Sequence, residues 1–264
     1  KIKLIYMLSK QIFDYIYIFD GKERSLIISS FIKCKNKLAL STKNKSFYKF
    51  FGIKIFIDDE QEPLNKIFQK IVCYSSIDFK INNYKFLNKK LDNKFSLNIP
   101  IKNYTHLHLD EKWIHNLYIK NYTRIDPTFD ELITFLKLLS NNNNLLVTTG
   151  AVDFDLLNLL INNFFKKIDK NIFIKNCENS DIYFIHKPTF EDIESLLRNT
   201  KTLISCHGAI THAANSFNVK SIDIIEEKKT IFYNRFTSYL SNYNFVFRSN
   251  FSVLSRDLLK LVDK

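Results

Sequence analysis

The stretch that decides the fold is Leu203–Asn215, which reads LISCHGAITHAAN. An apolar run ends at Ser205, a turn of small residues follows around Gly208, and a helix is predicted to begin near Ile210. Gly208 is one of only four glycines in the chain, and glycine permits either a close backbone approach or a positive φ. Because a strand that passes directly into a helix is half of a βαβ unit, the stretch predicts an α/β fold.

The same alternation of strands and helices extends through the second part of the chain. Apolar runs predict strands over Tyr104–Leu109, Leu145–Thr148, Asp181–Ile185, Thr202–Ser205 and Lys220–Ile225. Helical spacing of apolar residues predicts helices over 128–139, 153–165, 189–198, 210–217 and 252–262. Capping pairs, Thr128 with Glu131 and Thr189 with Asp192, mark the starts of two of these helices. Such a pattern predicts a parallel sheet with right-handed crossovers.

The first part of the chain shows a similar but weaker pattern. Strands are predicted over Tyr15–Phe19, Leu38–Leu40 and Lys54–Ile57, with helices over Lys3–Ile12, Ser25–Phe31 and Glu62–Tyr74. Residues 75–103 are polar and irregular, and the Ile99-Pro100 pair disfavours a helix. We therefore predict two Rossmann-like domains with parallel sheets, an N-terminal one over 1–100 and a C-terminal one over 101–264, with a cleft between them.

Composition fits a globular protein with a basic surface. The 264 residues are 45% hydrophobic and 25% charged, which excludes a mainly disordered chain. The formal net charge is +12. The excess reflects either solvated lysines of a chain rich in Lys, Asn, Ile and Phe, or a face toward an anionic partner. No apolar run reaches the roughly 18 residues of a membrane span and no signal-peptide pattern opens the chain, so we predict a cytoplasmic protein.

The four cysteines are widely spaced, at Cys34, Cys73, Cys177 and Cys206. No pair has the C-x-x-C spacing, which excludes the common zinc and thioredoxin motifs. We interpret these thiols as reduced and mostly buried.

The turn before the predicted helix at Ile210 is the main candidate site. Backbone N–H groups and the dipole at the start of a helix favour a phosphate. The side chains that surround this turn can donate hydrogen bonds to a diphosphate or a sugar. The candidate donor-binding residues here are Ser205, His207, Gly208, Ala209, Thr211 and His212. The alternative is an ordinary strand-to-helix turn with a satisfied histidine.

Several motifs, in order along the chain, resemble glycosyltransferase family 9, the lipopolysaccharide heptosyltransferase type. Val147–Gly150 (VTTG) resembles the family's TGG-like turn, and Lys187–Ile193 resembles its G-x-(S/T)-x-x-E-L helix. Thr200–Ala214 resembles the pattern that ends D-S-G-x-x-H-x-A-A, and Asn218–Ile224 resembles G-V-P-x-V-x-L. Phe13–Ser25 resembles an earlier Tyr-Asp stretch of the family. In this chain the family's Asp-Ser/Thr-Gly becomes Cys206-His207-Gly208, so the acid is replaced and His207 is the candidate substitute.

The resemblance implies a GT-B fold and a glycosyltransferase. It implies transfer of a hexose or heptose from a nucleotide-diphosphate sugar donor to a cell-surface glycan or lipid precursor, as in lipopolysaccharide or polysaccharide biosynthesis. No cofactor is expected, and no metal, because a helix dipole and cations would hold the diphosphate. The family's first strand, Gly-Asp loop and catalytic base have no counterpart here. We therefore expect an incomplete N-terminal domain and assign no catalytic residue.

The remaining site residues follow the other predicted strands. The resemblance places Lys112 near the donor phosphates, and Thr149 and Gly150 in a donor-binding turn. Lys187, after the predicted strand Asp181–Ile185, is a candidate to bind the base or a phosphate of the donor, and the alternative is a surface lysine before a capped helix. Glu226, at a strand end, is predicted to bind a ribose diol. Asp110, Glu111 and the single tryptophan, Trp113, are candidates for the acceptor or sugar. The alternative for this loop is a solvated charged segment with Trp113 packed beneath it.

The sequence also bears on other partners and functions. Arg235 and Arg248, in a basic aromatic region, are predicted either to face anionic lipid at the inner face of the plasma membrane or a phosphorylated acceptor, or to be solvated. Nucleic acid is not predicted as a partner, because no basic helix or RNP-like motif is present. A Cys206–His207 hydrolase is disfavoured, because adjacent residues of a turn point apart. A non-catalytic relative that binds a nucleotide sugar stays open.

Overall fold

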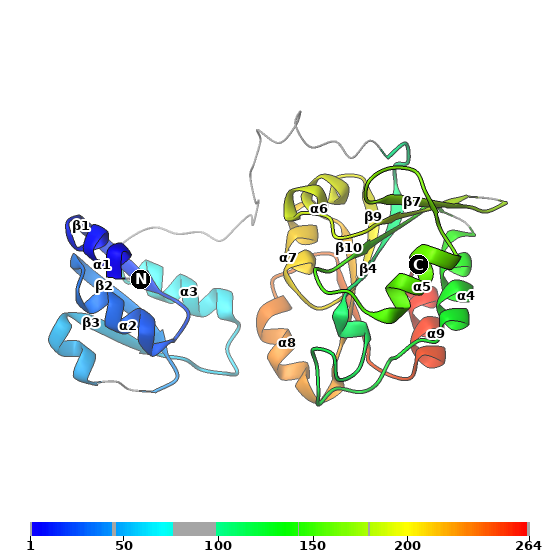
Figure 1. The fold of residues 1–264 in the computed structure, drawn as a ribbon. Helices are drawn as coiled ribbons and strands as arrows, with labels where there is room; N and C mark the ends of the chain where they lie inside the picture. The colour runs from blue at the N-terminus through cyan, green and yellow to red at the C-terminus, as the bar shows by residue number, and fades with distance from the viewer. Residues whose placement is uncertain (1, 44–45, 76–98, 142, 179, 263–264) are drawn as a thin grey trace. The chain divides into compact units, whose positions relative to one another are not determined.

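The structure is a computed structural model, and it describes residues 2–43, 46–75, 99–141, 143–178 and 180–262. The chain divides into two compact units. Unit 1 comprises Lys1–Asn82 with Ile231–Tyr239, and unit 2 comprises Asn83–Thr230 with Leu240–Lys264. Figure 1 shows the elements of each unit along the chain.

Unit 1 is built on a parallel sheet in the order β1-β2-β3. Its elements are α1 (Ile2–Ser9), β1 (Ile12–Ile18), α2 (Glu23–Ser30), β2 (Lys33–Ser41), the 3₁₀ helix η1 (Ser46–Phe51), β3 (Ile53–Ile57), α3 (Leu64–Cys73) and α8 (Thr230–Thr237, grouped here from Ile231). Alternate residues of β2 face opposite sides of the sheet, as strand geometry requires. Ala39 packs with Leu26 of α2 on one side, whereas Leu38 packs with Ile71 of α3 on the other.

Unit 2 contains a sheet in the order β11-β10-β9-β4-β5-β8-β7-β6. Its strands are β4 (Tyr104–Leu109), β5 (Leu145–Thr149), β6 (Lys166–Lys167), β7 (Ile172–Asn176), β8 (Asp181–Ile185), β9 (Thr200–Cys206), β10 (Lys220–Ile225) and β11 (Tyr243–Phe247). β8, β5, β4, β9, β10 and β11 are parallel, and β7 and β6 add an antiparallel edge. Read from β8 to β11, this is the strand order of a doubly wound Rossmann fold.

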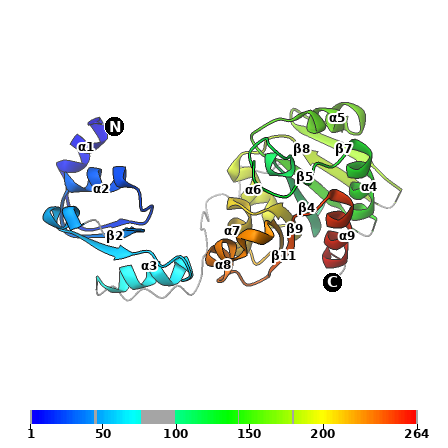
Figure 2. The same cartoon turned by 90° about the horizontal axis from the view of Figure 1, so that it is seen from below.

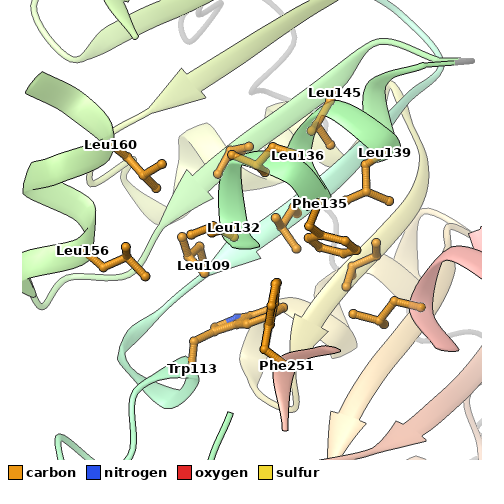
Figure 3. Packing of buried hydrophobic residues seen from close by; sticks show 14 of the residues in the cluster. Leu109, Trp113, Leu132, Phe135, Leu136, Leu139, Leu145, Leu156, Leu160 and Phe251 are labelled. Carbon is orange, nitrogen blue, oxygen red and sulfur yellow. The ribbon is translucent and has the colours of Figure 1, made fainter. Parts of the chain in front are cut away.

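Helices cover both faces of this sheet, as Figures 1 and 2 show. The helices are α4 (Phe129–Ser140), α5 (Asp155–Asn163), α6 (Phe190–Leu197), α7 (Ala209–Ser216) and α9 (Phe251–Val262), with the short 3₁₀ helices η3 (Glu111–Trp113) and η4 (Glu227–Lys229) in loops. Helices α4, α5 and α9 share one core with the sheet, and α7 packs on the opposite face against β9 and β10. Figure 3 shows the first of these cores, where Trp113 and Phe251 lie beside Leu132 and Phe135 of α4.

The two faces of the sheet differ in polarity. Leu107, Val147 and Ile204 belong to the core under α4, α5 and α9. The alternate positions carry buried polar side chains, His106 on β4, Thr148 on β5, Ser205 on β9 and Asp223 on β10. Because strand residues two apart face the same side, these polar groups lie on the face that α7 covers.

The predicted α/β fold with two Rossmann-like parts and parallel sheets is confirmed. The predicted strands at β4, β8 and β10 match their observed bounds, and both predicted capping boxes are present, at Thr128 and Thr189. Sequence analysis missed η1, the β6–β7 edge, α8 and β11. The predicted domain boundary near residue 100 adjoins residues 76–98, which lie outside the described part, and it stays a prediction. Ile231–Tyr239 groups with unit 1 although the prediction placed it in the second domain.

Candidate functional site

The candidate site lies in unit 2, where neighbouring parallel strands end. β5, the next strand along the chain, lies on one side of β4 in the sheet. β9, which comes later in the chain, lies on the other side of β4. The strand order therefore reverses between β4 and β9. In open α/β sheets, ligands bind beyond the carboxyl ends of the strands at such a point. The loops after these two strands carry Asp110, Lys112, His207 and Gly208.

Lys112 joins the two loops at this point. Its Nζ lies 2.9 Å from Asp110 Oδ2 in an ion pair and donates to the backbone oxygen of His207 at 3.0 Å. Burial by itself would lower the pKa of the ammonium, but Asp110, together with Cys206 and Glu111, outweighs burial, and the pKa of Lys112 is raised. The side chain is 20% exposed, and its ammonium is held in this ion pair at the carboxyl ends of β4 and β9.

The two glycines of the predicted site are explained by close packing. A Cβ on Gly208 would lie 2.9 Å from Lys112 Nζ, and one on Gly150 would lie 2.8 Å from Glu111 Oε2 and 3.0 Å from Asp110 Cβ. The φ of Gly208 is 179°, which is ordinary extended backbone. Of the two predicted reasons for Gly208, close approach is confirmed and a positive φ is wrong.

These contacts predict different costs for two alanine substitutions. Gly208→Ala should destabilise unit 2 by less than about 1 kcal/mol, because the Lys112 side chain can move away. Gly150→Ala should cost roughly 1–3 kcal/mol, because the Cβ of Asp110 belongs to a buried loop that cannot yield. Chemical denaturation followed by the fluorescence of Trp113, the single tryptophan, would measure both. Equal costs would contradict the packing described for Gly150.

Asp223 is the centre of a buried hydrogen-bond network that sequence analysis missed. It lies in the middle of β10 with no exposed surface. Its Oδ2 is 2.6 Å from His207 Nδ1, and its Oδ1 accepts from Thr211 Oγ1 at 2.7 Å and from Ser205 Oγ at 3.2 Å. One carboxylate thus connects β9, the turn after it and the first turn of α7. The signal in the sequence is an acid between two isoleucines, Ile222 and Ile224, in a predicted strand.

The network brings most of the predicted turn residues together. Ser205, His207, Thr211 and His212 lie around the start of α7, and Ala209 is its first residue. The His207 and His212 rings meet edge to face with centroids 5.4 Å apart. Burial lowers the pKa of His212, and the nearby His207 lowers it further. The hydroxyls of Ser205 and Thr211 are fully buried and donate to Asp223. The groups that can meet an anion at the amino end of α7 are therefore the two imidazoles and the first backbone N–H groups of the helix.

A second polar cluster links β4 and β5. The Thr148 hydroxyl is 2.7 Å from His106 Nε2 and 2.9 Å from His108 Nδ1. Burial lowers the pKa of His106 to about 3 and that of His108 to about 4. Both rings are therefore neutral at pH 7. This cluster stiffens the central strands beside Asp110.

The loop after β5 meets the loop after β8. Thr149 is buried, and its Oγ1 accepts a hydrogen bond of 2.8 Å from the backbone N–H of Lys187. Lys187 Nζ and His186 Nε2 lie 2.5 Å and 2.8 Å from the carboxylate of Asp153. Hydrogen bonds from Lys187 and His186 lower the pKa of Asp153. Lys187 is therefore held at the same end of the sheet, by an ion pair across two loops.

Trp113 corrects one prediction. Its ring is completely buried in the core with Phe251, and its Nε1 donates to the backbone oxygen of His108 at 3.0 Å. It is therefore not available to stack on a sugar, and the alternative, a tryptophan packed beneath the loop, is correct. Figure 3 shows the ring below α4. Asp110 is buried beside it, and Glu111 is half-buried next to Gly150.

Glu226 and Arg248 also differ from the predictions. Glu226 is buried, and its two oxygens accept from the N–H and hydroxyl of Thr123 at 2.7 Å and 3.2 Å. It fastens a loop, so a ribose diol would have to displace Thr123. Arg248 is 5% exposed and donates to the backbone oxygens of Lys112 and Thr123. The predicted solvated or lipid-facing role is therefore wrong for Arg248.

Cys206 is excluded as a nucleophile. It is buried, and burial raises the pKa of its thiol. Because the thiolate is the reactive form, a Cys–His hydrolase is not supported.

A pocket of about 480 Å³ opens beside this part of the sheet. It is lined by Ile114, His115, Leu117, Asp126, Pro127 and Asp153–Leu156. Its mixed apolar and acidic lining is of a kind that accepts a base or sugar. The prediction of a metal-free site took the chain to have no Asp-x-Asp motif, and this is wrong, because Asp153-Phe154-Asp155 has that spacing. Among the residues that the structure describes, no group of three or more His, Cys, Asp or Glu side chains is arranged to hold a metal ion.

The doubly wound unit, the second parallel-sheet unit and the site at the strand reversal define a GT-B-like α/β protein. Solved heptosyltransferases from E. coli have this fold. WaaC with ADP is 11% identical, with a TM-score of 0.63 over 99% of this chain and 75% of that one. WaaC with ADP-2-deoxy-2-fluoro heptose is 10% identical, with a TM-score of 0.62 over the same shares. ADP-heptose lps heptosyltransferase II is 11% identical, with a TM-score of 0.59 over 99% of this chain and 80% of that one. No protein-family model and no curated protein sequence matches the chain.

Proposed function

We propose that this protein is a glycosyltransferase that takes a sugar from a nucleoside-diphosphate donor and transfers it to a cell-surface glycan or lipid precursor. The observation that carries the proposal is the Asp223 network, which fixes His207 and Thr211 around the amino end of α7 at the strand reversal. The solved proteins of similar fold contain ADP or an ADP sugar. We propose a hexose or heptose as the sugar, and lipopolysaccharide or polysaccharide biosynthesis as the process.

The donor diphosphate is proposed to lie against α7. Its negative charge grows as the glycosyl bond breaks, so the helix dipole and the Lys112 ammonium would stabilise the leaving group. His207 and His212 would donate hydrogen bonds to phosphate or sugar oxygens. Gly150, Thr149 and Lys187 would border the donor on the β5 side. Because these groups supply the positive charge, we propose that the transfer needs no metal and no cofactor.

The acceptor is proposed to bind near Asp110 and Glu111. Both carboxylates lie at the carboxyl end of β4 beside the proposed diphosphate. A carboxylate can orient a hydroxyl group of a sugar acceptor. The protein is proposed to act in the cytoplasm, at the inner face of the plasma membrane where lipid acceptors are presented. No helix in the described ranges is both long enough and apolar enough to cross a bilayer.

Nucleotide binding tests the proposal directly. ADP should raise the melting temperature of the wild-type chain, because a ligand that binds only the folded state stabilises it. His212→Ala should remove most of this shift, since the imidazole beside His207 would no longer contact the diphosphate. Lys201→Ala is the control, because Lys201 is exposed at the amino end of β9, the opposite end of the strand from the proposed site.

An ADP shift of wild-type size in His212→Ala would contradict the proposed diphosphate site.

A second experiment separates an enzyme from the non-catalytic relative. The protein is incubated with ADP-heptose and a lipid acceptor precursor, and only an enzyme would release ADP in the presence of the acceptor.

A further inference from the structure

The 3₁₀ helix η1 of unit 1 presents aromatic rings to solvent. Its sequence is Ser-Phe-Tyr-Lys-Phe-Phe over Ser46–Phe51. Phe50 is 94% exposed and Phe47 67% exposed, and Phe51 is also exposed. These three phenylalanines, which we call the aromatic turn, follow one another within five residues. Apolar side chains gathered in this way mark a surface that contacts another body.

The backbone under the aromatic turn is firmly held. Tyr48 is buried with Leu26 of α2, and its hydroxyl donates to Glu23 Oε1 at 3.2 Å. The buried Lys37 donates from Nζ to the backbone oxygen of Phe51 at 3.3 Å. Because Tyr48 and Lys37 fix the inner side of η1, the phenylalanine rings are directed outward by the fold and not by a loose loop.

Gly52 fixes the point at which η1 ends. The N–H of Gly52 donates to the backbone oxygen of Lys49 at 3.0 Å, and Gly52 has a φ of +71°. Glycine adopts this left-handed conformation at little cost. β3 then begins at once at Ile53, which is buried, so the aromatic turn is anchored at its carboxyl end.

Lysines flank the aromatic turn in the sequence. The segment 42–57 contains four lysines and no Asp or Glu. Lys43, Lys49 and Lys54 are exposed. Lys49 lies inside η1 itself, between Phe47 and Phe50. A complementary partner must therefore offer both negative charge and a medium into which aromatic rings can insert.

We propose that the aromatic turn inserts into the headgroup region of an anionic phospholipid bilayer, with the neighbouring lysines on the lipid phosphates. Aromatic rings favour the interface between water and hydrocarbon. Lysines near an anionic leaflet add attraction for each charge. This proposal concerns unit 1 only and does not depend on the nucleotide site of unit 2. It also assigns the predicted membrane contact to residues other than Arg235 and Arg248.

Vesicle sedimentation of the full chain tests the proposal. Wild-type protein should sediment with vesicles of phosphatidylcholine and phosphatidylglycerol, and much less with phosphatidylcholine alone. The double variant Phe47→Ser/Phe50→Ser should bind the anionic vesicles roughly tenfold more weakly, because the inserted apolar surface is lost. The matched control is Tyr118→Ser/Phe190→Ser, which removes two exposed aromatic rings from unit 2.

The lysines are tested in the same way. Lys43→Gln/Lys49→Gln should weaken binding to the anionic vesicles by roughly fivefold for each lysine. Lys166→Gln/Lys167→Gln, on the exposed strand β6, is the charge-matched control. Circular dichroism of each variant confirms that it folds.

Three results would overturn the proposal. The first is a wild-type chain that does not sediment with the anionic vesicles, and the second is a Phe47→Ser/Phe50→Ser variant that binds like the wild type. The third is a wild-type dimer in light scattering that this variant abolishes, since the aromatic turn would then pair with a second copy. The ADP shift is expected to be unchanged in these variants, so failure here is distinct from failure of the nucleotide site.

Discussion

Replacing Asp223 by asparagine should weaken ADP binding by at least about tenfold and destabilise unit 2 by roughly 2–4 kcal/mol. The carboxylate has three side-chain partners, one each on His207, Thr211 and Ser205. The amide of asparagine can serve only part of this set, because its nitrogen cannot accept a hydrogen bond. The buried imidazole or a hydroxyl is then left unpaired. Titration calorimetry with ADP and denaturation followed by Trp113 fluorescence measure the two effects.

The control for this substitution is Asp257→Asn in helix α9, where the carboxylate is exposed and forms a surface pair with Lys260. That variant should change stability by less than about 1 kcal/mol and leave ADP binding intact. Thr211→Val removes one partner of Asp223 and should show a smaller loss of the same kind. An Asp223→Asn protein that binds ADP like the wild type would remove Asp223 from the proposed site.

Acid should destabilise unit 2 well before its carboxylates are protonated. Burial lowers the pKa of His106 to about 3 and that of His108 to about 4, against an ordinary value of 6.5. Below pH 6.5 the two histidines therefore bind protons in the unfolded chain but stay neutral in the folded chain. Stability is fully present above pH 6.5 and falls as the pH decreases toward 4. The slope is up to about 1.4 kcal/mol per pH unit for each histidine.

Denaturation at a series of pH values between 7 and 5, followed by the buried Trp113, measures this slope. His108→Gln removes one titrating group and should make the slope shallower. An identical slope in His108→Gln and wild type would show that the acid sensitivity arises elsewhere. The experiment therefore tests whether the pair on β4 is neutral in the folded protein.

Local sequence was sufficient for the parallel core of unit 2. β4, β8 and β10 are short apolar runs bounded by polar turns, and such runs have few alternatives to a buried strand. Helices α4 and α6 were recognisable because Thr128 and Thr189 are followed by the acids of their capping boxes. These signals lie within a few residues, so no distant contact was needed to interpret them.

Elements without such signals were missed. β6 and β7 owe their strand state to antiparallel pairing with one another and with β8. β11 pairs only with β10, and its buried and exposed positions do not alternate cleanly. Helix α8 groups with unit 1, a contact between residues far apart in the chain. Context of this kind overrides local propensity, and a single sequence does not contain it.

The candidate site also contains residues that local sequence predicts and residues that only the tertiary structure brings together. The residues around α7 follow from a strand, a glycine turn and a helix in direct succession, which is local information. Asp223 joins them from another strand, 16 residues beyond His207. Trp113 shows where local information fails. Its place in a loop predicts contact with a sugar, but its ring fills the core. Loop position does not reveal which side of the loop a ring faces.

The amino-acid sequence by itself determined the α/β class, the strand-to-helix turn at Gly208 and the helix that follows it, because apolar periodicity and caps act over one or two turns of chain. Only the tertiary structure decided which side chains meet there: Asp223 beneath His207, Lys112 across the strand reversal, and the aromatic turn left outside the core. Such neighbours come from separate strands and loops, and their distances are set when the sheets assemble and the helices pack on them.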